Sequence, residues 1–260
     1  MSFPPLLFAL MVWFFGTAAV VWLDSRPRST FRRSFRGAGI VALMALAAIV
    51  LTASDSSMTS VYIAFAASVA IWGWHEMGFL MGFVSGPSHD PCPPEARGWA
   101  RFKLATATVI HHEIALAATV LLLFALTWGQ PNQAAPLAFA LLFVMRLSAK
   151  LNLFFGVPSL SDEVFPAHLA YLKTYFRKAR CNWLFPVSVT LGSAATWWAW
   201  TAAEAARDPG VAASYTLVAG LAFLGVVEHL FLVLPIRDAM MYRWATPQPV
   251  KAKTISTERR

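Results

Sequence analysis

The chain has 260 residues, of which 58% are hydrophobic and only 13% are charged, and its formal net charge is +8. A water-soluble domain of this size would carry about 25% charged residues, so the composition excludes an ordinary soluble protein and indicates several membrane-spanning helices. The basic residues occur in short runs beside apolar segments, which is a pattern that orients membrane proteins and does not indicate nucleic-acid binding.

We predict an all-α, polytopic membrane helix bundle with about seven transmembrane helices. Each apolar segment is long enough to cross about 30 Å of hydrocarbon at about 1.5 Å per helical residue. The predicted helices cover residues 4–23, 37–54, 59–84, 104–128, 135–157, 183–202 and 212–236.

The basic residues of the connecting segments predict the orientation of the bundle. Segments 24–36, 86–103 and 158–182 and the C-terminal tail together carry 18 Lys and Arg residues, whereas the opposite connections carry only Arg207. Because cytoplasmic loops are enriched in Lys and Arg, we expect the N-terminus outside and the C-terminus in the cytoplasm.

We predict a single domain. It would comprise a transmembrane helix bundle over residues 1–245, with cytoplasmic cap loops at 85–103 and 158–182, and a flexible cytoplasmic tail at 246–260. Apolar residues at helical spacing between basic residues further predict an interfacial amphipathic helix at 166–180.

Ionisable residues lie inside four of the apolar segments, where hydrocarbon penalises a charge by roughly 2.5 kcal/mol or more. Counted from the helix ends they are about 10 to 17 Å deep, all on the cytoplasmic side. We therefore predict that the third, fourth, fifth and seventh helices enclose one polar chamber. Its predicted members are His75, Glu76, His111, His112, Glu113, Arg146, Lys150, Glu228 and His229, with Asp162, Glu163 and His168 as loop candidates.

One interpretation of these residues is a satisfied polar network that fixes the packing of the helices. Arg146 and Lys150 are four residues apart and share a helix face. They would neutralise two of the three carboxylates of Glu76, Glu113 and Glu228, and the histidines would bridge.

A second interpretation is a metal centre, because histidine and carboxylate ligands suit a divalent metal such as Fe or Zn. The candidate ligands share no known spacing, the chain has only six histidines, and two buried cations would oppose a divalent ion. The candidate ligands are His75, His111, His112, Glu228 and His229.

A third interpretation is a pigment site. A neutral histidine can coordinate the magnesium of a chlorin, a basic side chain can hold its carboxylates, and Trp72, Trp74, Phe79 and Phe83 could pack against the macrocycle. A transporter or proton relay is a weaker alternative because the chain has no inverted repeat.

Four motifs give the chain a family resemblance. WHEMGFLMG at 74–82, HHEIAL at 111–116, the long segment 146–186 from RLSAKLNLFF to CNWLFP, and VEHLFLVLPI at 227–236 are similar to those of the PuhE family. The family comprises photosynthetic complex assembly proteins of phototrophic bacteria, and the resemblance spans nearly the whole chain.

The resemblance implies a multi-pass protein of the bacterial inner, intracytoplasmic photosynthetic membrane. The family's genes lie beside those of a reaction-centre protein and of bacteriochlorophyll synthesis. We therefore expect a factor in the lipid bilayer that assists assembly of the reaction centre and light-harvesting complex and handles bacteriochlorophyll. Its partners would be photosynthetic complex subunits or pigment-synthesis proteins. The alternative is a membrane metalloenzyme acting on a lipophilic tetrapyrrole or carotenoid. The resemblance supplies no catalytic residues, so whether the chain is an enzyme stays open.

Overall fold

The structure is a computed structural model, and it describes residues 4–159 and 166–234. This part of the chain is helical and forms no β-strand, which agrees with the predicted all-α bundle. The predicted tail at 246–260 lies outside the described residues. The helices are α1 (Pro5–Asp24), α2 (Arg28–Thr52), α3 (Met58–Leu80), α4 (Gly98–Leu126), α5 (Ala134–Phe155), η2 (Ala167–Leu169), α6 (Ala170–Lys173), α7 (Leu184–Ala205) and α8 (Pro209–Phe231).

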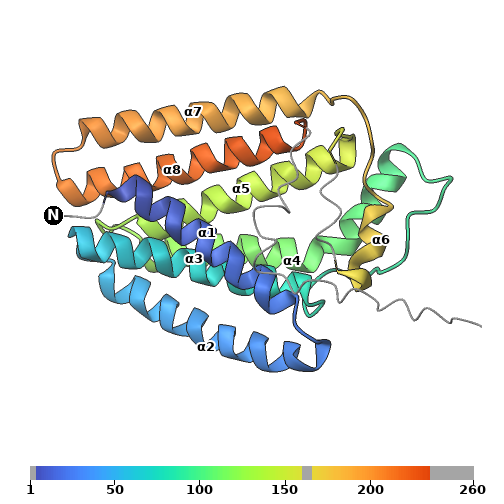
Figure 1. The fold of residues 1–260 in the computed structure, drawn as a ribbon. Helices are drawn as coiled ribbons and strands as arrows, with labels where there is room; N and C mark the ends of the chain where they lie inside the picture. Colours follow the sequence, from blue (N-terminus) through green and yellow to red (C-terminus); the bar gives the residue numbers. More distant parts are fainter. Residues whose placement is uncertain (1–3, 160–165, 235–260) are drawn as a thin grey trace, which may run out of the picture.

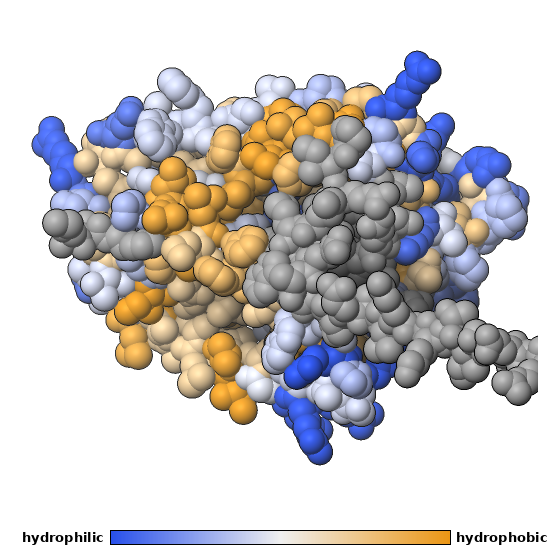
Figure 2. Space-filling view, viewed as in Figure 1, coloured by the Kyte–Doolittle hydropathy of each residue, from blue (hydrophilic) through white to orange (hydrophobic). Residues whose placement is uncertain are grey.

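Six of the helices, α1 to α5 and α8, are long and apolar enough to cross a membrane. Their large apolar side chains are exposed outside the bundle, as lipid-facing residues are; examples are Leu43, Leu51 and Leu121. Figure 2 shows this apolar surface as a broad area of one face, with hydrophilic residues mainly at its margins. The chain is therefore a multi-pass helical membrane protein.

The helix α7 has 22 residues, the same number as α5, but carries several hydroxyl side chains and a cluster of tryptophans. It packs along its whole length against α8, and Figure 1 shows this pair along one edge of the bundle with α2 along the opposite edge. A seventh transmembrane crossing, and with it the predicted orientation, remains a prediction.

The helix α3 is the centre of the bundle. It contacts α1, α2, α4, α5 and α8, and much of its length is buried, including Phe65, Trp72 and Phe79. Residues on this helix therefore face protein on several sides. An ionisable residue on α3 must find its partner inside the bundle.

Two helices begin six or more residues before their predicted starts. The helix α2 starts at Arg28, directly after Pro27, so four of the five arginines of segment 24–36 form its first turns instead of a loop; they are Arg28, Arg32, Arg33 and Arg36. Proline is common at helix starts because it has no backbone N–H to pair, and no residue in the next turns breaks the helix. The helix α4 likewise starts at Gly98 instead of 104.

The predicted amphipathic helix at 166–180 is wrong in length. Only η2 and the four-residue α6 are helical; turns follow at 174–176, and from Arg177 the chain pairs with the end of α5. The Arg177 amide donates to the Leu153 carbonyl at 3.0 Å, and the Ala179 amide donates to the Val157 carbonyl at 3.3 Å. These hydrogen bonds to α5 take the place of the hydrogen bonds that a helix would form. The helical spacing of apolar residues in 166–180 was therefore not sufficient to predict a helix.

The two predicted cap loops pack against each other at one end of the bundle. The Tyr175 hydroxyl donates to the Asp90 carbonyl at 3.2 Å, and the Cys92 amide donates to the Thr174 hydroxyl at 2.8 Å. The Arg101 guanidinium reaches from α4 to the carbonyls of Tyr175 and Phe154. These bonds fix the loops as a structured cap.

The first cap loop is also wedged against the backbone of α4. The Ser88 amide donates to the Ala107 carbonyl at 3.2 Å, and the His112 amide donates to the Ser85 carbonyl at 3.0 Å. A Cβ atom on Gly86 would overlap the Ala107 carbonyl oxygen, so this contact needs a glycine. The loop therefore helps to set the rotation of α4 about its axis.

Candidate functional site

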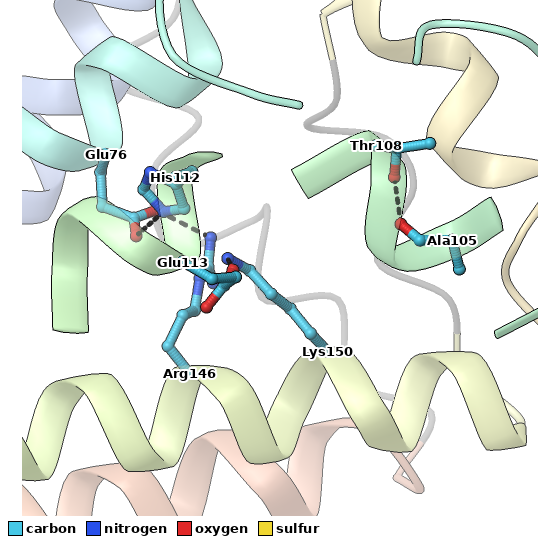
Figure 3. A network of polar contacts seen from close by, with 7 residues as sticks. All are labelled: Glu76, Ala105, Thr108, His112, Glu113, Arg146 and Lys150. Carbon is cyan, nitrogen blue, oxygen red and sulfur yellow. Dashed lines mark hydrogen bonds and ion pairs between the residues drawn. The ribbon is translucent and has the colours of Figure 1, made fainter. Parts of the chain in front are cut away.

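Two ion pairs join α5 to the neighbouring helices α3 and α4 (Figure 3). The Arg146 Nη2 atom lies 3.0 Å from Oε2 of Glu76 on α3, and the Lys150 Nζ atom lies 2.5 Å from Oε1 of Glu113 on α4. The two cations are one turn apart on α5 and so share a face. The two carboxylate side chains are only 10% and 13% exposed. The predicted pairing of both cations with two of the three glutamates is therefore present.

His112 completes this group, which we call the charge network (Glu76, His112, Glu113, Arg146 and Lys150). Its ring is fully buried, packs at 4.8 Å on Phe79, and places Nε2 at 3.7 Å from Oε1 of Glu76. Within the described residues, neither ring nitrogen of His112 has a hydrogen-bond partner, and one oxygen each of Glu76 and Glu113 also lacks one. Two carboxylates and two cations make the network neutral overall when the imidazole is uncharged.

His229 lies in a second polar cluster, between α5, α7 and α8. Its Nδ1 is 2.8 Å from the Gly225 carbonyl and must donate to it, and its Nε2 lies 3.0 Å from the Ser148 hydroxyl. The Ser148 hydroxyl also lies 2.8 Å from that of Ser188. The amide of the fully buried Asn152 donates to the Ser188 hydroxyl at 2.9 Å. Both nitrogens of His229 lie within hydrogen-bond distance of protein groups, and the ring acts as a packing element.

His75 also has a protein partner. Its Nε2 lies 2.9 Å from the Thr119 hydroxyl on α4. That hydroxyl donates its proton to the Ala115 carbonyl at 2.9 Å, so the imidazole must be the donor at Nε2. This hydrogen bond joins α3 to α4 and leaves His75 outside the charge network.

The prediction of one chamber containing all the ionisable residues is wrong. His111 is exposed on the outer face of α4. Glu228 is exposed on α8 and accepts a hydrogen bond from the indole nitrogen of Trp13 on α1 at 3.0 Å. Adjacent helical residues point about 100° apart, so packing buries His112 and His229 and turns their neighbours outward.

His168, the one loop candidate that the structure describes, does not join the charge network either. The Nε2 atom of His168 lies 2.8 Å from the Leu80 carbonyl, which attaches the second cap loop to the end of α3. Burial lowers the pKa of His168 below its ordinary value, and Arg28 lowers it further against the opposing effect of that hydrogen bond. Asp162 and Glu163 lie outside the described residues.

The donor set of the predicted metal centre does not fit a metal ion. In the chain from 4 to 159 and 166 to 234, no three His, Cys, Asp or Glu side chains gather closely enough to hold one. Ring nitrogens of His75 and His229 form hydrogen bonds with protein groups, and His111 and Glu228 are exposed. We therefore assign no metal chemistry to these residues.

Prediction from the sequence found the buried charges but missed most of the second cluster. Ser188 and Asn182 support Asn152 from α7 and its preceding loop, and Thr119 and Trp13 supply partners to His75 and Glu228. The available signal was the spacing of Ser148 and Asn152, which places two polar side chains one turn apart inside an apolar helix.

Comparison with known proteins gives a family but no named activity. A family model described as "Protein of unknown function (DUF3623)" matches residues 2–253. A protein of Rhodobacter capsulatus, described as "Uncharacterized 30.4 kDa protein in puhA 5'region", is 39% identical over 246 residues, covering 93% of this chain and 89% of the relative. No solved structure matches the chain.

Proposed function

The chain belongs to the DUF3623 family, and we propose that it is a membrane-embedded assembly factor of the photosynthetic apparatus. It would assist assembly of the reaction centre and light-harvesting complex and handle bacteriochlorophyll as cargo. The observation that carries the proposal is the relative, which is named for its position in the 5′ region of puhA and aligns over nearly all of this chain. The motif resemblance to the PuhE family points the same way.

The contacts of the buried charges support a structural role for them. Each cation of the charge network has a carboxylate partner, and the network links α3, α4 and α5. Removing one partner of such a buried pair strands the other charge, whereas the intact pair holds helices in one register. The charge network therefore stabilises the packing of the three helices. We propose that the cargo binds at a different place on the protein.

His111 is the residue that we propose for pigment contact. It lies near the middle of the 29-residue α4, on the same outer stripe as the exposed Ile114, Leu121 and Leu122. Ionisable residues within membranes almost always face the protein interior, so a histidine on a lipid-facing stripe calls for a partner from outside the chain. Among the described side chains, none forms a hydrogen bond or ion pair with His111.

A chlorin could bind both His111 and the exposed apolar residues around it. A neutral imidazole can coordinate its central magnesium, and the flat apolar macrocycle can cover the aliphatic residues of the stripe. The proposed partners that would deliver or receive the pigment are photosynthetic complex subunits or pigment-synthesis proteins. We also propose that the capped end with the arginines faces the cytoplasm, following the charge asymmetry of the sequence.

A pigment-binding experiment tests the proposal. Bacteriochlorophyll a is added to the detergent-purified full chain, excess pigment is removed by size exclusion, and the absorbance that comigrates with protein is measured. We expect retention by the wild type and by the control Ile114→Ala, and at least a tenfold loss in His111→Ala, since about 1.4 kcal/mol already gives tenfold. Equal retention by His111→Ala would refute the assignment.

A further inference from the structure

Two adjoining cavities open at the end of the bundle where α1 ends and α2 begins. Their volumes are about 350 Å³ and 590 Å³, and they share Arg28, Phe31 and His168 as lining residues. They lie apart from the charge network and from the outer face of α4. Nothing in the proposed assembly function uses them.

Arginines line the cavities on one side. Arg28 and Arg32 lie one turn apart at the start of α2 and line the smaller cavity, and Arg26 joins Arg28 at the larger one. Within the described residues, no carboxylate lies within ion-pairing distance of Arg28 or Arg32. Among the described residues their guanidinium groups therefore have no carboxylate partner, and guanidinium groups recognise phosphate through paired hydrogen bonds.

A carboxylate stands beside these arginines but is not bonded to them. Asp24, the last residue of α1, lines the larger cavity, and both of its carboxylate oxygens are buried without a hydrogen-bond partner among the described residues. A buried carboxylate without a donor is costly. Asp24 therefore lacks a donor, which a positively charged group bound beside the arginines could supply.

The remaining lining residues favour an amphiphile. Phe31, Met81 and Leu169 supply an apolar wall to the smaller cavity. The two lining histidines already have partners, since the Nε2 atom of His168 contacts the Leu80 carbonyl and that of His89 contacts the Ser85 hydroxyl. The arginines and Asp24 are consequently the lining residues that would bind the polar part of a ligand.

We propose that these cavities bind the phosphoethanolamine head group of an amino-phospholipid from the adjacent leaflet. Arg28 and Arg32 hold the phosphate, Asp24 accepts from the ammonium group, and the apolar wall contacts the start of the acyl chains. Basic pockets at the ends of transmembrane helices are known sites of lipid head groups. Asp24 distinguishes this site from one for a purely anionic lipid, because the ammonium group of phosphoethanolamine supplies the cationic donor that Asp24 lacks and a purely anionic head group has none.

The test is native mass spectrometry of the full chain, released from detergent that contains equal amounts of palmitoyl-oleoyl phosphatidylethanolamine, phosphatidylglycerol and phosphatidylcholine. We expect one phosphatidylethanolamine to be retained, at least tenfold over phosphatidylcholine, whose trimethylammonium group cannot donate a hydrogen bond. Asp24→Asn should remove this preference, and the pair Arg28→Gln with Arg32→Gln should abolish retention. The exposed Arg33 on the same helix lines neither cavity, so Arg33→Gln is the matched control.

Three results would overturn the proposal. Equal retention of phosphatidylcholine would remove the role of the ammonium group, and an undiminished preference in Asp24→Asn would remove the role of the carboxylate. Displacement of the lipid by an equal concentration of soluble phosphoethanolamine would show a water-soluble ligand instead of a lipid. Each readout is independent of pigment binding, so failure here leaves the proposed assembly function untouched.

Discussion

Removing Arg146 should destabilise the bundle more than neutralising its partner Glu76. The Glu76 side chain is 10% exposed, whereas that of Arg146 is 42% exposed. In Arg146→Ala a nearly buried carboxylate loses its cation, and breaking a buried pair in this way typically costs about 3–5 kcal/mol. In Glu76→Gln the side-chain amide oxygen can still accept a hydrogen bond from Arg146. The Arg146 side chain is also less buried than that of Glu76, so leaving it without a carboxylate costs less. We expect a loss of only about 1–1.5 kcal/mol there.

The asymmetry leads to a sharper expectation for the double variant. Glu76→Gln combined with Arg146→Ala contains no stranded carboxylate, so it should be more stable than Arg146→Ala alone. The expected difference is about 2 kcal/mol, within the range of coupling energies measured for residues in contact. Additive losses would instead make the double variant the least stable of the three.

The free energy of unfolding can be measured by titrating dodecylmaltoside-solubilised protein with SDS and following circular dichroism. Arg207→Ala provides the control, because this arginine is exposed in the connection between α7 and α8 and surface substitutions usually change stability by less than about 0.5 kcal/mol. A double variant no more stable than Arg146→Ala, or an Arg146→Ala variant as stable as the control, would refute the reasoning.

Three further predictions follow from the cap. Gly86→Ala should lower the thermal unfolding temperature in detergent by several degrees, because its methyl group would overlap the Ala107 carbonyl; an unchanged temperature would mean that the loop does not press on α4. The pKa of His168 is lowered, chiefly by burial, so the unfolded chain binds more protons as the pH drops through its ordinary value of 6.5, and stability should fall with decreasing pH in that range. His168→Gln should flatten that part of the pH dependence, and an equally steep fall would contradict the assignment. Cys181 is a free, exposed thiol, and a membrane-impermeant maleimide should label it in inverted vesicles but not in intact spheroplasts; the reverse result would invert the proposed orientation.

The sequence predicted the helical class and the positions of most spans because hydropathy and length decide both. It also predicted the pairing of Arg146 and Lys150 with glutamates, since residues one turn apart must share a face. The early start of α2 was not predictable from hydropathy, because its first turns are basic and their helical structure continues beyond the apolar segment.

The division of the histidines between inside and outside could not be predicted. His111 and His112 are neighbours of identical chemistry, and the rotation of α4 decides which one is buried. That rotation depends on contacts between distant segments, such as the bond from the His112 amide to the Ser85 carbonyl in the first cap loop. Helical periodicity carries no information about such contacts, so the prediction of a single chamber placed both residues inside.

The most direct test of the proposed function is the distribution of pigment in a phototrophic strain that lacks this gene. Complex-bound bacteriochlorophyll is measured from the absorbance of intact membranes, and total bacteriochlorophyll from a solvent extract of the same cells. An assembly factor predicts that the bound fraction falls, that the wild-type gene restores it, and that no biosynthetic intermediate accumulates. An unchanged bound fraction, or accumulation of a tetrapyrrole or carotenoid intermediate, would contradict the assembly role, and the second result would favour an enzyme.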